Sequence, residues 1–215
     1  QFLYENRKNV KAAIIVWDQQ EKYLDRKHVI EAAWNWINMT IPVISSTFAS
    51  FSRMCKNLGA ETLGHLFIDE AGQALPQAAV GAIYRSRHVM VVGDPLQIKP
   101  VLTLDSNTLY MLGEHFGVTE KYLSASASAQ ILADAASQYG FYRKQDKAED
   151  SWVGIPLWVH RRCRYPMFTI SNMISYDGFM VQGMEKYGKA DWFDVGGMAN
   201  NKYVEEQGEF LLHKL

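Results

Sequence analysis

The feature that most constrains this chain is the alternation of short apolar runs with helical patterns in its first half. Residues 42–47, 65–68 and 89–92 predict three strands, and residues 48–58 and 75–83 carry helical spacing. Alternation of strands and helices is typical of a parallel sheet, and apolar runs without alternation predict strands that are covered on both faces. We therefore expect an α/β fold with a parallel sheet flanked by helices.

Polar residues follow each of these three predicted strands. The pairs are Ser46-Thr47, Asp69-Glu70 and Gly93-Asp94. In open α/β sheets, ligands bind outside the carboxyl ends of the strands. We expect the three pairs to line one edge of one sheet and to form part of a binding site there.

Composition places the chain among folded intracellular proteins. Of its 215 residues, 48% are hydrophobic and 21% are charged, and it has no run of 18 apolar residues, so we expect no membrane span. The two cysteines show no metal-ligand spacing, which favours a reduced, cytoplasmic protein. The net charge of −1 does not by itself indicate nucleic-acid binding. The N-terminus lacks an initiator Met, which predicts an internal start.

The adjacent carboxylates Asp69 and Glu70 are the first candidates for chemistry. Successive side chains of a strand point to opposite faces, so one carboxylate can hold Mg²⁺ while the other orients an attacking water. The alternative is a helix N-cap, because carboxylates are favoured before a helix.

The second candidate element is the segment GDPLQIKP, residues 93–100. Gln97 carries a neutral amide, which donates and accepts hydrogen bonds and so can contact both a phosphate oxygen and a water. The alternative is an ordinary Gly-Asp-Pro turn after a buried strand.

Together these elements resemble a known family. An apolar strand, DEAG, a second apolar strand and GDPxQxxP follow the order of motifs II and III in superfamily 1 helicases. Residues 42–54 (PVISSTFASFSRM) resemble motif Ic, and residues 159–180 (VHRRCRYPMFTISNMISYDGFM) resemble motif IV. The most similar group is the 5′-to-3′ branch that includes the nonsense-mediated-decay helicase. The resemblance implies a P-loop NTPase-type helicase core with RecA-like domains.

The resemblance also implies roles in binding and hydrolysing ATP. Asp69 would coordinate Mg²⁺, Glu70 would be the general base, and Gln97 would sense the γ-phosphate, with Asp94 beside it. Arg161 would reach the γ-phosphate and act like an arginine finger. Arg162 is the competing choice, and a solvated basic surface is the alternative for both arginines.

A single strand of nucleic acid, with DNA favoured over RNA, is the partner that the resemblance implies. Ser46, Thr47, Lys99 and Pro100 are the candidates for contacting that strand. The alternatives are helix capping for the two hydroxyls and a solvated lysine.

The expected organisation has four parts. Residues 1–40 form a helical lead-in, and 41–110 form part of the first RecA-like domain. Residues 111–151 form a helical connection, with a helix at about 126–138, and 152–215 open a second RecA-like domain.

One family element is missing from the sequence. No GxxxxGK[ST] loop, whose backbone N–H groups and Lys cradle phosphates, occurs in the chain. We therefore expect the isolated chain to hydrolyse ATP negligibly. The alternatives to a helicase fragment are a non-enzymatic nucleic-acid-binding or degenerate helicase module, and an unrelated P-loop ATPase.

Overall fold

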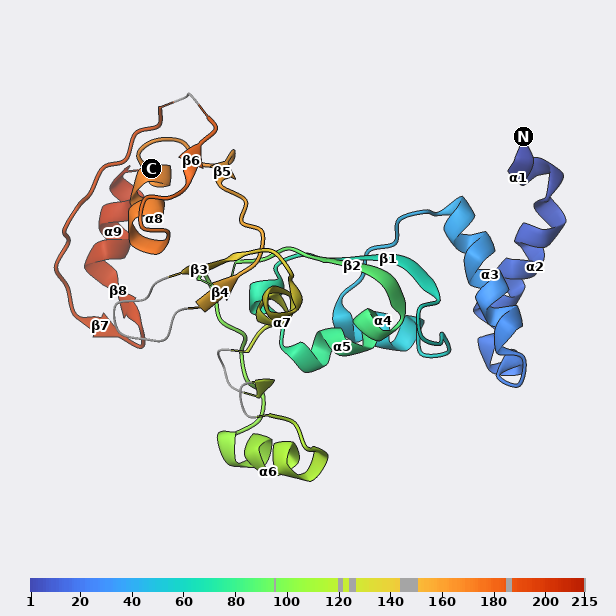
Figure 1. The fold of residues 1–215 in the computed structure, drawn as a ribbon. Coiled ribbons are helices and arrows are strands. Elements are labelled where there is room, and N and C mark those ends of the chain that lie inside the picture. The colour runs from blue at the N-terminus through green and yellow to red at the C-terminus, as the bar shows by residue number, and fades with distance from the viewer. Residues whose placement is uncertain (95, 120–121, 124–126, 144–150, 185–186, 215) are drawn as a thin grey trace. The chain divides into compact units, whose positions relative to one another are not determined.

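The computed structural model describes all residues except 95, 120–121, 124–126, 144–150, 185–186 and 215. The chain divides into two compact units, Gln1–Pro156 and Leu157–Leu215, and each is described by itself (Figure 1). The sequence analysis placed a domain boundary before Trp152, slightly earlier than the division between these units. Within the described residues the strands form four two-stranded sheets.

Helices fill the start of the first unit, as the sequence predicts. They are α1 (Phe2–Glu5), α2 (Arg7–Asp18), the 3₁₀ turn η1 (Gln20–Tyr23) and α3 (Lys27–Thr40). The apolar stripe of α3 is buried, and it comprises Ile30, Ala33, Trp34 and Ile37. Its helical spacing therefore indicated the buried face correctly.

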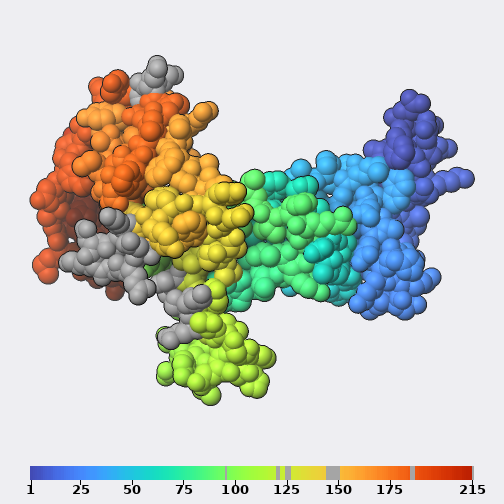
Figure 2. Space-filling model, in the orientation of Figure 1, coloured from blue at the N-terminus to red at the C-terminus, as the bar shows by residue number. Residues whose placement is uncertain are grey.

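The stripe of α3 packs against the segment that follows α4 (Phe48–Met54). Ile30 and Trp34 form a core cluster with Cys55 and Leu58. The N-terminal helices, in blue, adjoin this next part of the chain on the surface in Figure 2. Arg85 supports the cluster from outside, because its Nε donates to the carbonyl oxygens of Cys55, at 2.9 Å, and Leu58, at 3.1 Å.

The buried thiol of Cys55 gives a simple test of this packing. Burial raises the pKa of Cys55 to about 11, and the nearby positive charge of Arg85 only partly offsets the effect. Because the thiolate is the reactive form, we expect a thiol reagent at pH 8 to modify the partly exposed Cys163 first. Mass spectrometry of the timed reaction should find Cys55 labelled only when the chain is unfolded. Equal labelling of both cysteines in the folded chain would contradict the packing.

A strand–helix–strand unit forms the centre of Gln1–Pro156. It consists of β1 (Leu63–Ile68), the 3₁₀ turn η2 (Ala71–Gln73), α5 (Pro76–Tyr84) and β2 (Ser86–Val91). The two strands are parallel, with Leu63 opposite Ser86 and Ile68 opposite Val91. This is the parallel pairing that the sequence predicts for residues 65–68 and 89–92. Residues 42–47 were also predicted to be a strand, but they form no strand and are exposed.

Among the described residues, one face of this sheet packs against a core and the other is largely exposed. Ile68 belongs to a core cluster with Ala71, Ala79 and Ala129, so α5 and α7 (Ala129–Ala136) contribute to that face. The opposite face carries Phe67, which is 69% exposed, and Met90, which is 56% exposed. The prediction that both faces are covered is therefore wrong for the described residues. In the described part of the chain this sheet has two strands, β1 and β2.

The helix α6 (Ser106–Phe116) was not predicted from the sequence. Asp105 caps its start, because its Oδ1 accepts from the Thr108 amide at 3.0 Å, and Gly117 ends it with φ 65°. The Thr108 hydroxyl and amide hydrogen bonds lower the pKa of Asp105. Asp and Gly are residue types that commonly mark the start and the end of a helix, so the sequence contained signals for both ends of α6.

Helix α7 is the predicted helix at about 126–138, of which residue 126 lies outside the described residues. It is followed by the antiparallel pair β3 (Phe141–Arg143) and β4 (Ser151–Val153). The charged sequence from Arg143 to Asp150 also predicts a turn, and its residues 144–150 lie outside the described residues. Asp134 of α7 is buried, and its Oδ1 accepts from the Gly154 amide at 3.1 Å, which ties α7 to the end of β4.

The second unit begins with a short parallel pair. Strands β5 (Val159–His160) and β6 (Val181–Gln182) are joined through α8 (Met167–Ser175). Asn172 of α8 is buried and exchanges two hydrogen bonds with the Met180 backbone, each 3.0 Å long. The remaining elements are β7 (Ala199–Asn200), β8 (Tyr203–Val204) and α9 (Glu205–Lys214).

Among the residues that the structure describes, no helix combines the length and apolar character that a membrane crossing requires.

Candidate functional site

The register of β1 and β2 brings their carboxyl ends to the same level. Ile68, the last residue of β1, lies opposite Val91, the last residue of β2. Beyond them the pairing continues, because Val92 N–H donates to the Ile68 carbonyl at 2.8 Å and Ala71 N–H donates to the Val92 carbonyl at 3.0 Å. The DEAG and GDP segments therefore start side by side at one edge of the sheet.

Gly93 is where the two segments approach most closely. A Cβ atom on this residue would lie 2.5 Å from the Gly72 nitrogen and 2.6 Å from the Ala71 nitrogen. Both neighbours are backbone atoms of buried residues, so they cannot rotate away as a flexible side chain could. Only glycine fits this contact, so the need for glycine at residue 93 does not depend on turn formation.

The two carboxylates lie exposed on this edge. Asp69 Oδ1 accepts from the Glu70 amide at 3.0 Å, and Glu70 Oε2 accepts from the Gln73 side-chain amide at 3.2 Å. Glu70 has a left-handed backbone, with φ 53° and ψ 37°. Such a conformation is costly for a non-glycine residue and persists only where the surroundings impose it.

The helix-capping alternative for these carboxylates has little support in the geometry. Helix α5 begins at Pro76, and its N-cap residue is Leu75. Glu70 precedes η2 but makes no side-chain cap hydrogen bond to it.

Asp94 and Gln97 form a compact loop after β2. Asp94 Oδ1 accepts from the Leu96 amide at 3.0 Å, and its Oδ2 accepts from the Gln97 side-chain amide at 2.9 Å. Asp94 is half-buried and Gln97 is exposed. Pro95, which belongs to the motif, lies outside the described residues.

The candidate nucleic-acid contacts lie on two segments. Ser46 and Thr47 are exposed, and Phe48 of α4 packs against the core cluster that contains Ile68. Lys99 is exposed, whereas Pro100 is buried. The start of α4 and the end of β1 therefore share one core.

Thr47 has a structural role that can be measured. Its hydroxyl oxygen accepts from the Ser50 amide at 3.3 Å and caps α4. We expect Thr47→Ala to lower the free energy of unfolding by about 1 kcal/mol, the usual effect of losing an N-cap. Urea unfolding measures the change, and Thr47→Ser, which keeps the oxygen, is the matched control. Identical midpoints for Thr47→Ala and the unchanged chain would show that the cap contributes nothing.

Arg161 and Arg162 belong to the second unit. Both are exposed and lie in a short turn after β5, where the Cys163 amide donates to His160 Nε2 at 2.9 Å. This turn fixes the backbone on either side of the two arginines.

The donor set at the strand ends fits a magnesium ion that is bound mainly through phosphates. Mg²⁺ keeps several waters and takes one or two carboxylates together with phosphate oxygens, so a single exposed Asp69 suffices. Within the described ranges, no group of three or more His, Cys, Asp or Glu side chains could hold a metal ion by itself. A metal held by protein ligands alone does not match this edge.

Gln73, which contacts Glu70, was not among the residues predicted for this edge, although it stands three residues after a strand-end carboxylate. Gly93 was predicted to lie at this edge, but its close approach to the Ala71 and Gly72 backbone could not be predicted from a single sequence.

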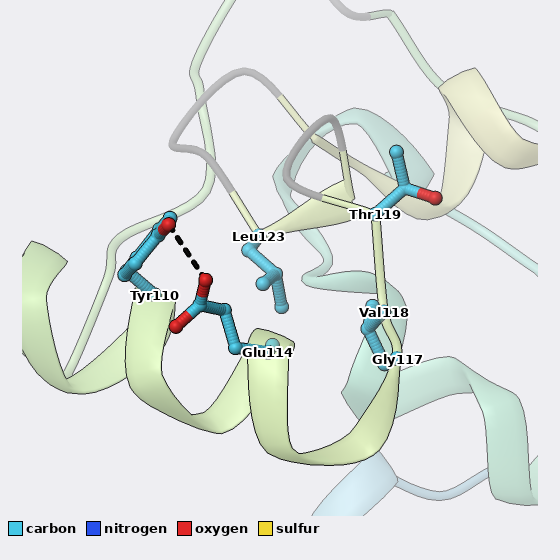
Figure 3. Close-up of a pocket in the computed structure, with 7 residues that line it drawn as sticks. Tyr110, Glu114, Gly117, Val118, Thr119 and Leu123 are labelled. Carbon is cyan, nitrogen blue, oxygen red and sulfur yellow. Dashed lines mark hydrogen bonds between the residues drawn. The ribbon is translucent and has the colours of Figure 1, made fainter.

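A separate hollow lies beside α6. It has a volume of about 250 Å³ and is lined by Tyr110, Gly113, Glu114, Gly117, Val118, Thr119 and Leu123 (Figure 3). The Tyr110 hydroxyl donates to Glu114 Oε1 at 2.8 Å across one helical turn. The candidate residues at the strand ends do not line this hollow.

Comparison of the chain with family models, curated proteins and solved structures found no match.

Proposed function

We propose that this chain carries the water-activating half of the nucleotide site of a superfamily 1 helicase, with β1–β2 as part of a RecA-like domain. The observation that supports this most is the strand register, which sets Asp69-Glu70 beside Gly93-Asp94 at one carboxyl edge. In parallel α/β sheets this is the edge where ligands bind. The resemblance in motif order implies that the nucleotide is ATP. It also implies that the partner is a single strand of nucleic acid, with DNA favoured over RNA.

The reaction is the transfer of the γ-phosphoryl group of ATP to water. A new bond forms between the water oxygen and the γ-phosphorus, and the bond from that phosphorus to the β,γ-bridging oxygen breaks. Glu70 takes the proton that the water loses, and ADP leaves with the electrons of the broken bond. Asp69 holds Mg²⁺, which would neutralise charge on the phosphates.

Gln97 is proposed to report the state of the γ-phosphate to the rest of the protein. In the structure its amide donates to Asp94. A side-chain amide both donates and accepts hydrogen bonds, so Gln97 has the chemistry to contact a phosphate oxygen. Arg161, or Arg162 beside it, would supply positive charge to the same phosphate, and Ser46, Thr47, Lys99 and Pro100 would contact the strand.

The missing phosphate loop makes a sharp prediction for the chain alone. We expect no measurable ATP turnover, with or without a single-stranded oligonucleotide, because the β- and γ-phosphates lack their main anchor. The measurement is phosphate release together with titration of a fluorescent ATP analogue and Mg²⁺. Steady turnover by this chain that Glu70→Gln abolishes would overturn the prediction.

The function itself is tested on a longer polypeptide in which a GxxxxGK[ST] loop precedes this chain. Binding of the analogue and ATP turnover stimulated by single-stranded DNA or RNA would support the helicase. If the longer polypeptide binds the strand but no nucleotide, the proposal fails and a nucleic-acid-binding module takes its place. Comparing the ATP turnover stimulated by DNA and by RNA of the same sequence shows which strand is preferred, because RNA differs by its 2′-hydroxyl.

A further inference from the structure

We infer that Gln73 is a positioning residue for Glu70, and this inference rests on the proposed function. The Gln73 side-chain amide donates to Glu70 Oε2 at 3.2 Å. With that oxygen engaged, Oε1 is the atom that accepts the proton of the attacking water. Neither the motif pattern nor the sequence analysis gave Gln73 a role.

The turn between the two residues sets this contact. Gln73 N–H donates to the Glu70 carbonyl at 3.0 Å and closes one turn of 3₁₀ helix. Glu70 precedes η2 and has a left-handed backbone, whereas Gln73 is the last residue of η2. The closed turn holds the two residues close enough for the Gln73 side-chain amide to donate to the Glu70 carboxylate.

Buried residues hold the turn on both sides. Ala71 and Gly72 are buried, and Ala71 N–H donates to the Val92 carbonyl at 3.0 Å. After the turn, the Ala74 carbonyl accepts from Ala129 N–H of α7 at 2.8 Å. The turn is thus fixed to β2 at one end and to α7 at the other, while the two contacting side chains remain exposed.

The chemistry of an amide suits a residue that positions a base. Glutamine donates a hydrogen bond to the carboxylate without adding a full positive charge. A lysine in its place would stabilise the ionised carboxylate more strongly and make it a weaker base. An alanine would leave the Glu70 side chain with several rotamers, of which only some direct an oxygen to the water.

The first arm of the test uses this chain and asks whether the contact exists. Side-chain amide signals of Gln73 are recorded by ¹H–¹⁵N NMR in the unchanged chain, in Glu70→Ala and in Glu70→Gln. We expect the Gln73 signals to shift and to exchange faster with solvent in Glu70→Ala, and to change less in Glu70→Gln, which keeps an acceptor oxygen. Gln77, an exposed glutamine on α5, is the internal reference in the same spectra.

The second arm uses the hydrolysis-competent polypeptide described above and asks whether the contact matters. Gln73→Ala should lower kcat by about tenfold, the lower end of the usual effect of removing a residue that orients a reactive group. KM should stay within about twofold, because the proposed role of Gln73 is to orient Glu70 and not to bind the nucleotide. Gln77→Ala, the same substitution four residues later, should leave both constants unchanged.

The outcomes separate the two proposals. Gln73 signals that are identical in the unchanged chain and in Glu70→Ala would overturn the inference. Active polypeptide whose kcat is unaffected by Gln73→Ala would also overturn it, and the proposed function would stand. If the unchanged longer polypeptide hydrolyses no ATP, the proposed function fails, and the catalytic role of Gln73 fails with it even where NMR detects the contact.

Discussion

Glu70→Gln should lower the ATP turnover of the hydrolysis-competent polypeptide by about 100-fold or more, the usual effect of losing a general base. The substitution keeps the size of the side chain and removes only its ability to take a proton. Because Glu70 is exposed and makes one local side-chain hydrogen bond, the fold should not change. The measurement is kcat at saturating ATP, with KM and the unfolding midpoint determined on the same samples.

Glu61→Gln is the matched control for this prediction. Glu61 is exposed, precedes β1 instead of following it, and has a left-handed φ of 55°, close to the 53° of Glu70. The same substitution in the same backbone conformation should therefore leave turnover unchanged. Comparable activity of Glu70→Gln and Glu61→Gln would show that Glu70 is not the base.

Gly93→Ala should destabilise the first unit by about 2–3 kcal/mol, in the range of forced overpacking. The added methyl group would lie 2.5 Å from the Gly72 nitrogen, and the backbone of the two strand ends must separate to accept it. This separation would also weaken the hydrogen bond from Ala71 N–H to the Val92 carbonyl. We therefore expect loss of nucleotide turnover in the longer polypeptide together with the loss of stability.

Gly64→Ala provides the comparison within the same sheet. Gly64 lies in β1, and a Cβ atom on it would meet nothing within 4 Å. Without a clash, the substitution reduces the freedom of the unfolded chain and should change stability by less than about 1 kcal/mol in either direction. The measurement is the urea unfolding midpoint of Gly93→Ala and of Gly64→Ala. Equal midpoints would contradict the close contact at Gly93.

Much of the local structure could be predicted from the sequence where the pattern was long or the chemistry specific. The spacing of Ile30, Ala33, Trp34 and Ile37 indicated the buried face of α3. The apolar runs at 65–68 and 89–92 indicated two strands, and these strands are parallel. Periodicity reports burial, so it succeeds where one face of a helix or strand packs against a core.

The failures have physical causes that a single sequence does not contain. Residues 42–47 have the composition of a strand but lack a neighbouring strand to pair with in the described residues. Phe67 and Met90 are apolar but exposed. Their exposure could not be predicted, because the composition of a strand does not tell which face of the sheet a further layer covers. The contact of Gln73 with Glu70 depends on the 3₁₀ turn between them, and this turn was not predicted from the sequence. Helix α6 is the exception, because Asp105 and Gly117 mark its ends in the sequence and the helix could have been predicted from them.

At the strand ends, the candidate catalytic residues and the residues that hold the fold together are different, and this has an evolutionary consequence. Asp69 and Glu70 are exposed and bonded locally, whereas Ala71, Gly72 and Gly93 hold the two strand ends together. If the two carboxylates hydrolyse ATP as proposed, substitutions that destroy hydrolysis meet little selection from folding, while substitutions that disrupt the scaffold are removed. A lineage that no longer needed ATP hydrolysis would lose its carboxylates by drift and keep the same sheet. In homologues, the small residues should therefore outlast the acidic ones.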